Sequence, residues 1–252
     1  MLNSAEFDQY AGEYTRTVQD AIGASGESVE FFAQLKVQLM GRVLDPDKPS
    51  SILDFGCGIG NTTRALASHF RASTVDGFDV SPESTRIADG MTPDSGGQIR
   101  YVSGQGSSLP FPDDTFDAVF AACVFHHIDE GERLHWAQEL KRVLRPGGRL
   151  FLFEHNPLNP LTVRVVRRIP FDAGVVLLRP WSTRSMLRTA GYEADSPWFY
   201  FFFPAALRAL RRAEILLRHV PLGAQYLAVA RKPAEQSELM SAKSSRSVRA
   251  LS

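Results

Sequence analysis

A glycine-rich loop between an apolar segment and an amphipathic segment is the feature that most constrains this chain. Residues 51–67 read SILDFGCGIGNTTRALA, with glycines at positions 56, 58 and 60. A glycine has no Cβ atom and tolerates positive φ angles, so such a loop lets a ligand approach the main chain closely. The segment therefore predicts a strand, a ligand-binding turn and a helix in succession.

Strand-like and helix-like segments alternate from residue 51 to residue 155. Because strands separated by helices are joined by right-handed crossovers, this alternation predicts a doubly wound α/β fold with a parallel sheet. The length of 252 residues suits one such domain. The expected parts are an N-terminal helical lid (1–48), a cofactor-binding core (50–155), an acceptor-side region with the final strands (156–232) and a disordered tail (233–252).

Composition and charge limit the class of protein. No apolar run approaches the roughly 20 residues of a membrane span, and the first residues do not resemble a secretory signal. The two cysteines, Cys57 and Cys123, form no disulfide framework, so we expect a cytoplasmic protein. Residues 1–139 hold 9 basic and 21 acidic side chains, whereas residues 140–252 hold 19 and 7. The basic half either pairs with the acidic half or meets an anionic substrate or a membrane surface; no nucleic-acid-binding motif is present.

The acidic residues at the predicted strand ends indicate what the glycine loop binds. Asp54 precedes the first glycine, where a carboxylate would repel a pyrophosphate and attract an ammonium group. The spacing G-x-G-x-G differs from the dinucleotide fingerprint G-x-G-x-x-G, and no Walker lysine follows. Asp79 ends the next strand, the position that faces ribose hydroxyls in doubly wound folds. S-adenosylmethionine, an amino acid joined to a nucleoside, fits these features.

At this point the chain resembles the class I S-adenosylmethionine-dependent methyltransferases, within the small-molecule group that includes the ubiquinone and menaquinone biosynthesis enzymes. The resemblance lies in the segments ILDFGCGIGNTT, GFDVSPESTRIA, SLPFPDDTFDAVFAACVFHHI and LKRVLRPGGRLFLFEH. It implies a Rossmann-like sheet of seven strands in the order 3-2-1-4-5-7-6, with strand 7 antiparallel. It also implies S-adenosyl-L-methionine as the cofactor and transfer of its methyl group to a small molecule.

The resemblance implies roles for individual residues. It implies that the methionine part of the cofactor is surrounded by Asp54, Phe55, Gly56 and Gly58. It also implies that Asp79 holds the ribose and that Val80 lies beside the adenine. The backbone carbonyl of Cys123 is implied to face the cofactor. The family usually has an acid after the third strand, where this chain has Gln105 and Gly106, so the adenine contact there loses its charge. Tyr14 belongs to the segment FDQYAGEY, which is similar to the family's lid or is an ordinary amphipathic helix.

Catalytic groups are less distinct than the cofactor site. A base is needed only if the acceptor must lose a proton, and the candidates are His127, Glu154 and His155, which follow the fourth and fifth strands. We expect no metal site, because neighbouring histidines His126 and His127 point to opposite sides of an extended chain and no third ligand has a diagnostic spacing.

The predicted substrate is a small hydrophobic or anionic metabolite, with an oxygen acceptor slightly favoured by how often the family uses one. Two rivals remain. One is a relative that binds S-adenosylmethionine as a scaffold or for another reaction. The other is a nicotinamide oxidoreductase, which the glycine spacing and Asp54 disfavour.

Overall fold

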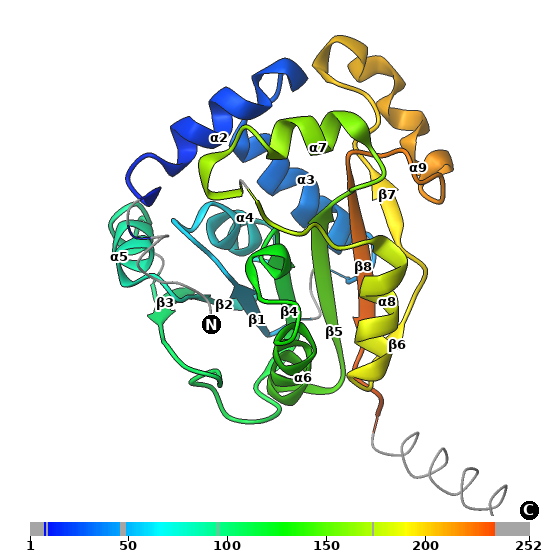
Figure 1. The fold of residues 1–252 in the computed structure, drawn as a ribbon. Helices are drawn as coiled ribbons and strands as arrows, with labels where there is room; N and C mark the ends of the chain where they lie inside the picture. Colours follow the sequence, from blue (N-terminus) through cyan, green and yellow to red (C-terminus); the bar gives the residue numbers. More distant parts are fainter. Residues whose placement is uncertain (1–7, 9, 46–48, 95, 173, 235–252) are drawn as a thin grey trace, which may run out of the picture.

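The structure is a computed structural model that describes residues 8, 10–45, 49–94, 96–172 and 174–234. One twisted sheet runs through the molecule, with helices on both of its faces (Figure 1). The strands are β1 (Ser51–Phe55), β2 (Thr74–Asp79), β3 (Ile99–Ser103), β4 (Phe116–Ala122), β5 (Leu144–His155), β6 (Glu193–Ala194), β7 (Trp198–Tyr200) and β8 (Gln225–Arg231).

The strand order is β3-β2-β1-β4-β5-β8-β6, and β7 also pairs with β8. Strands β1 to β5 pair in parallel, and β8 is antiparallel to β5. The predicted Rossmann-like order is therefore confirmed. The one difference is at the edge, where two short strands, β6 and β7, take the place of the single strand expected there.

The helices follow the predicted crossovers. They are α2 (Tyr14–Ile22), α3 (Val29–Gly41), α4 (Asn61–His69), α5 (Pro82–Gly90), α6 (Arg133–Val143), α7 (Pro160–Val166), α8 (Pro180–Thr189) and α9 (Glu214–Leu217). The 3-10 turns are η1 (Gly23–Ser25), η2 (Phe125–His127), η3 (Pro170–Asp172) and η4 (Ala205–Ala213). Residues 205–217 form η4 and the short α9 rather than one continuous helix.

The core has two layers because both faces of the sheet are covered. In β4, Val119 packs into the layer under α6 and α8, whereas Phe120 packs into the layer under α3 and α4. In β5, Leu152 and Phe153 divide between the layers in the same way. Each of these four side chains is at most 1% exposed. Such strands read as continuous apolar runs, which is why they were recognisable in the sequence.

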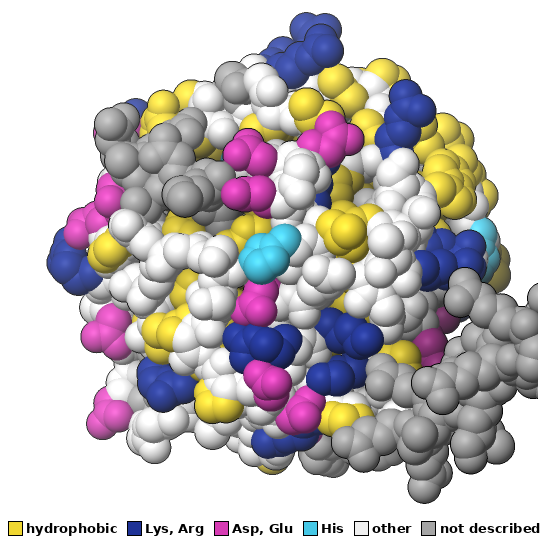
Figure 2. All heavy atoms as spheres, turned by 60° about the horizontal axis from the view of Figure 1, so that its bottom comes forward, with side chains coloured by type: hydrophobic (Ala, Val, Ile, Leu, Met, Phe, Trp, Pro, Cys, Tyr) yellow, Lys and Arg dark blue, Asp and Glu magenta, His cyan; other side chains and the backbone are white. Residues whose placement is uncertain are grey.

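The opposite charges of the two halves of the chain meet at the surface. Arg142 pairs with Asp113, Arg145 with Asp117, and Lys232 with Asp114, each pair joining the basic half to the acidic half. On the face turned forward in Figure 2, basic and acidic side chains lie among one another rather than in separate fields. Part of the charge asymmetry is therefore neutralised within the molecule.

Within the described residues, no helix is long and apolar enough to cross a membrane. Cys57 and Cys123 are both free. The predicted tail lies almost entirely in residues 235–252, outside the described residues.

Candidate functional site

A cavity opens at the carboxyl ends of the parallel strands, where doubly wound sheets bind ligands. Its floor consists of the glycine loop after β1 and the residues that follow β2, β4 and β5. Its roof consists of α2, part of α3, and residues 165–172. Of the residues predicted for the site, the following line the cavity: Tyr14, Phe55, Gly56, Gly58, Asp79, Val80, Cys123, His127 and His155.

The glycine loop is held against the neighbouring strand by its main chain. The backbone amides of Gly56 and Cys57 both donate hydrogen bonds to the Phe78 carbonyl, at 2.8 and 3.0 Å. Gly56 has a φ of 75°, and a Cβ atom there would lie 2.3 Å from a methyl carbon of Val124, so this position requires glycine. Gly58 also has a positive φ, of 52°, but a Cβ atom there would meet open space. The loop thus exposes bare main chain to the cavity at Gly58.

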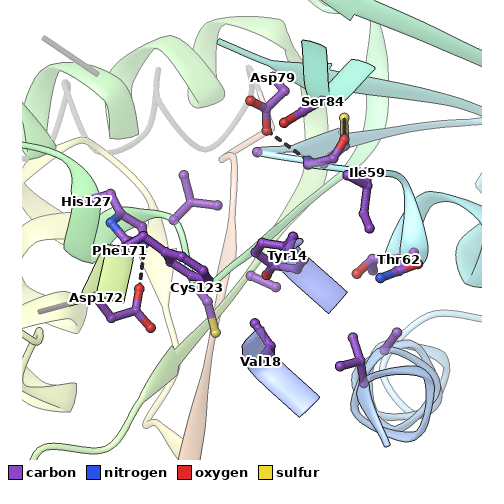
Figure 3. A pocket seen from close by; sticks show the side chains of 18 of the residues that line it. Tyr14, Val18, Ile59, Thr62, Asp79, Ser84, Cys123, His127, Phe171 and Asp172 are labelled. Atoms are coloured by element: carbon purple, nitrogen blue, oxygen red, sulfur yellow. Dashed lines mark hydrogen bonds and ion pairs between the residues drawn. The ribbon is translucent and has the colours of Figure 1, made fainter. Parts of the chain in front are cut away.

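Asp79 links the two binding loops at the end of β2. One of its carboxylate oxygens accepts a hydrogen bond from the Gly58 amide at 2.8 Å, and the other accepts one from the Ser81 amide at 2.9 Å. Burial raises the pKa of Asp79 despite these bonds. Its carboxylate is thereby fixed at the cavity wall (Figure 3) with lone pairs left to accept further hydrogen bonds from a ligand.

Asp54 lies under the loop rather than along the cavity wall. Its side chain accepts a hydrogen bond from the Thr63 hydroxyl at 2.7 Å, which joins β1 to the first turn of α4. It is 2% exposed and is not among the residues that line the cavity. Burial raises its pKa to about 7, and the hydrogen bond from Thr63 only partly opposes this rise. Its direct contact with a ligand stays a prediction.

The N-terminus of α4 completes this end of the cavity. Gly60 caps the helix in the left-handed conformation, and no side chain occupies the first amides. Asn61 and Thr62 border the cavity there. A helix N-terminus attracts a carboxylate. The bare loop at Gly58, the acceptor at Asp79 and this helix end therefore fit an adenosyl amino acid.

The roof is a small apolar cluster. Tyr14 stacks on Phe171 with ring centroids 5.3 Å apart, and Tyr10 contacts the same ring at 5.4 Å. Helices α2 and α7 lie beside one another over this end of the sheet (Figure 1). The buried residues of this cluster, Ala21, Ile169 and Phe171, are separate from the two main core layers. Phe7, the first residue of the predicted lid motif, lies outside the described residues.

The wall opposite Asp79 carries Cys123 and a group of histidines (Figure 3). Cys123 follows β4 with a φ of 58°, which is unusual for a residue other than glycine, and its amide donates to the Phe153 carbonyl. Burial raises the pKa of its thiol to about 11, so the thiol is neutral near pH 7. The chain turns at this residue and places η2 beside the cavity.

The histidines differ in charge because their neighbours differ. Burial alone would lower the pKa of His126, but the charges of Glu154 and Asp172 and the close contact between Nδ1 and Glu154 raise it well above its usual value. Burial lowers the pKa of His127, against the effect of Asp172. Burial and the neighbouring charge of His126 lower the pKa of His155 to about 4. His155 is therefore neutral at physiological pH.

Glu154 is held behind this wall. Its Oε1 accepts a hydrogen bond from the Phe125 amide at 2.9 Å, and its Oε2 lies 2.6 Å from Nδ1 of His126. Glu154 does not border the cavity. Gln105 and Gly106 also lie away from the cavity, in an exposed loop after β3. The roles predicted for these three residues stay predictions.

Several polar residues of the cavity were not singled out from the sequence, among them Asp172, Lys36 and Gln225. Lys36 of α3 is 8% exposed and borders the cavity, where an apolar helix face would usually carry a hydrophobic side chain. Gln225 at the start of β8 accepts a hydrogen bond from the Tyr200 hydroxyl at 2.6 Å and also borders the cavity. The sequence signal for Lys36 was a lysine within the largely apolar run of the expected N-terminal helical lid.

Comparison with known proteins identifies the core. Residues 52–148 match the model of a methyltransferase domain family. The chain is 28% identical to the uncharacterised methyltransferase YcgJ of Bacillus subtilis, over 79% of this chain and 75% of that protein. It is 34% identical to the demethylmenaquinone methyltransferase of Thermus thermophilus, over 49% of this chain and 56% of that protein. The chain spans about half the length, or less, of most of the curated relatives it matches.

Solved structures share the fold. A possible histamine N-methyltransferase from Thermotoga maritima matches with a TM-score of 0.62 and 18% identity, over 91% of this chain and 100% of that chain. The [4+2]-cyclase SpnF matches with a TM-score of 0.59 and 21% identity, over 80% and 82%. The matches together confirm the resemblance to class I methyltransferases and indicate S-adenosylmethionine as the cofactor.

Removal of the Asp79 carboxylate should weaken cofactor binding. We expect Asp79→Ala to reduce the affinity for S-adenosylmethionine and S-adenosylhomocysteine by about 1–3 kcal/mol, because a charged hydrogen-bond acceptor is lost. Isothermal titration calorimetry measures this change, with NADH as a third ligand. Asp76→Ala on the same strand is the control, because its carboxylate pairs with Arg100 at the surface. Unchanged affinity in Asp79→Ala, or tight NADH binding, would contradict the assignment.

The buried Asp54 should make stability depend on pH. Its pKa is about 7 in the folded chain and about 4 in the unfolded chain, so the wild type loses stability as pH rises between these values. Asp54→Asn keeps an acceptor for Thr63 without a charge. We expect it to exceed the wild type in free energy of unfolding by about 2–4 kcal/mol above pH 7, and to equal it near pH 4.

Asp117 provides a control of opposite sign. Burial opposes its ionisation, but hydrogen bonds from Ser50 and Arg145 lower its pKa to about 2. Its contribution is therefore present above pH 4 and is lost as pH falls towards 2, so Asp117→Asn should destabilise the protein at neutral pH. Urea unfolding at several pH values measures both effects. A constant difference between Asp54→Asn and the wild type from pH 4 to pH 8 would refute the Asp54 prediction.

Proposed function

We propose that this chain, which carries a class I S-adenosylmethionine-dependent methyltransferase domain over residues 52–148, transfers a methyl group to a small hydrophobic or anionic molecule. The observation that carries the proposal is the Asp79 carboxylate, which joins the Gly58 loop to the Ser81 turn at one end of a cavity whose other end holds histidines. The cavity therefore offers a carboxylate for a nucleoside at one wall and imidazoles for an acceptor at the other.

The residues of the chain would act mainly by position and by exclusion of water. When bound, S-adenosylmethionine supplies an electrophilic methyl group on a positively charged sulfur. Asp79 and the Gly58 loop orient the nucleoside side, and the first turn of α4 orients the amino-acid side. The stacked rings of Tyr14 and Phe171 close the roof. A dry, oriented site is what an in-line displacement requires.

Proton removal from the acceptor involves the histidine wall in this proposal. His127 and His155 both border the cavity, and burial lowers the pKa of each. Because His127 Nε2 lies 3.1 Å from Asp172, the proposal assigns His155 as the neutral imidazole that accepts a hydrogen bond from the acceptor. Glu154 acts behind them as a positioning residue, because His126 and the Phe125 amide occupy its oxygens. An oxygen acceptor suits this wall, since a hydroxyl donates to a neutral imidazole.

Lys36 favours an acceptor with a negative charge. Its ammonium group is on α3, buried at the cavity, and lies 5.8 Å from the centroid of the Phe32 ring, with no carboxylate partner within the described part of the chain. A buried charge without a partner is costly, so an anionic ligand group that reaches it gains a strong interaction. Most of the remaining acceptor side is apolar, with Val165, Ile169 and Phe171. An acid or phenolate with an apolar body matches both features.

The substitution Lys36→Met tests the acceptor class. Wild-type protein and labelled S-adenosylmethionine are incubated with a metabolite extract that has been separated into anionic and neutral fractions. We expect label to enter the anionic fraction, and Lys36→Met to lower that incorporation about 10-fold or more while cofactor affinity by calorimetry is unchanged. Lys141→Met, on α6 and away from the cavity, is the matched control.

Two other results would redirect the function. Cofactor binding without any methyl transfer would support the rival interpretation, a relative that binds the cofactor but does not methylate. This chain shares its fold with the [4+2]-cyclase SpnF, which is consistent with that interpretation. Transfer into neutral molecules alone, undiminished in Lys36→Met, would refute the anionic acceptor but not the methyltransferase.

We also propose that one face of the protein contacts an anionic membrane surface. Exposed leucines lie at the start of α7 and in the turn before β8, where Asn159 donates a hydrogen bond to the Leu222 carbonyl. Leu161 is 73% exposed and Leu222 is 61% exposed. A groove beside them is lined by Arg164, Arg167 and Arg168, which have no carboxylate partner among the described residues. Apolar side chains flanked by arginines are typical of peripheral binding to anionic lipids.

Vesicle sedimentation tests this contact. We expect the protein to sediment with phosphatidylglycerol-containing vesicles, less so at high salt, and not with pure phosphatidylcholine vesicles, because the arginines need anionic headgroups. Replacement of Arg164, Arg167 and Arg168 by Gln should abolish the binding. Met91→Ser, an exposed apolar residue at the end of α5, is the control. Equal sedimentation with both vesicle types, or with neither, would rule the contact out.

A further inference from the structure

Three potential metal ligands meet on the cavity wall opposite Asp79. The Nε2 atoms of His126 and His127 and a carboxylate oxygen of Asp172 all lie within 4.8 Å of one another. Asp172 Oδ1 is 3.1 Å from His127 Nε2 and 3.5 Å from His126 Nε2. Figure 3 shows His127 and Asp172 facing each other at the cavity, away from Asp79. The cluster joins η2 to η3 across 45 residues of sequence.

Two of the three spacings in the cluster match those of atoms bound to one ion. Ligand atoms at about 2.0–2.2 Å from a metal, at tetrahedral or octahedral angles, are about 2.8–3.6 Å apart. Both distances to the Asp172 oxygen fall in this range. The arrangement results from η2, which turns both imidazoles to the same side, with ring centroids 4.2 Å apart. The expectation of no metal site assumed an extended pair and no third ligand.

Two of these atoms are buried without a well-formed hydrogen bond. Within the described residues, His126 Nε2 and Asp172 Oδ1 have no hydrogen-bond partner, although they face one another. Buried polar atoms rarely lack a hydrogen bond, so these two atoms are expected to bind a ligand.

The Nδ1 side of the His126 imidazole already has the hydrogen-bond partner that a metal-bound histidine usually has. Its Nδ1 lies 2.6 Å from Glu154, and the second Glu154 oxygen is held by the Phe125 amide. A carboxylate that accepts the Nδ1 proton leaves the Nε2 lone pair directed at Asp172. This carboxylate–histidine–metal arrangement is the usual support of a metal-bound histidine.

We propose that His126, His127 and Asp172 bind a divalent transition-metal ion whose open positions face the cavity. Two imidazoles and one carboxylate favour zinc or another transition metal over magnesium or calcium, which prefer oxygen ligands. All three residues border the cavity, so an ion held there is able to take an oxygen atom of the acceptor as a further ligand. This inference goes beyond methyl transfer, because the ion binds whether or not an acceptor is present.

Metal titration of the wild-type protein tests the proposal directly. Full-length protein is freed of metal with a chelator and titrated with Zn²⁺ by calorimetry and with Co²⁺ by visible absorption. We expect one ion per chain and a Co²⁺ spectrum of a nitrogen–oxygen site.

Asp172→Asn and His127→Gln should each weaken binding about 100-fold or more, and Glu154→Gln about 10–100-fold through its effect on His126. His155→Gln is the matched control, since this histidine borders the same cavity but lies outside the three-ligand cluster. It should keep both the stoichiometry and the spectrum.

Absence of stoichiometric binding by the wild-type protein overturns the proposal, and so does binding that Asp172→Asn and His127→Gln leave unchanged. The titration of the wild-type protein is decisive by itself, so the proposal remains testable even if a variant misfolds. Failure here would leave the methyltransferase proposal intact, since cofactor binding is measured separately.

Discussion

The carboxylate of Asp79, fixed between two backbone amides, is the interaction on which the site depends. It orders the glycine loop after β1 and the turn before α5 against each other, so neither loop moves alone. Asp54 lies buried nearby, and burial together with the charge of Asp79 raises the pKa of Asp54, so that its ionised form is costly. The free protein therefore keeps two acids at the ends of β1 and β2 that a cationic ligand would stabilise. The two buried acids lower the stability of the free protein, and a bound cationic ligand would offset this loss.

The roof differs from the floor in how firmly it is held. The sheet and its two core layers include many fully buried side chains, whereas the roof rests on a cluster of three buried residues and the tyrosines packed on Phe171. A small apolar cluster has a low free energy of local opening compared with the core. Motion of α2 and of residues 165–172 would thus admit ligands without disturbing the strands that carry Asp79. The same roof segment bears the exposed arginines of α7, which places a surface contact next to the entrance.

The sequence predicted the framework well because the relevant signals are local. The glycine positions, the acid at the end of β2 and the apolar runs of β4 and β5 lie within single elements, so their spacing reveals them. Predictions that depended on partners far along the chain were weaker. Asp172 could not be connected to His127 because 45 residues separate them and η3 has no periodic signal. Lys36 was hidden in an apolar helix face, and Asp54 turned towards Thr63, a bond that no spacing rule indicates. Residues 205–217 form η4 and α9 in place of one helix, because Leu207 departs from helical geometry.

The distribution of charge in the cavity gives its two ends different chemistry. Asp79 lies at one wall, and Asp172 lies at the other with Glu154 behind it. Carboxylates at both ends favour positive charge between them, whether carried by a protonated His126, a metal ion or a sulfonium group. Lys36 is the one cation on α3 that reaches this space, so it balances the acids only on the acceptor side. An anionic acceptor then completes an alternation of charge along the cavity. The orientation of the acceptor would follow from this alternation, since a reversed acceptor would place its negative charge away from Lys36 and nearer to Asp79.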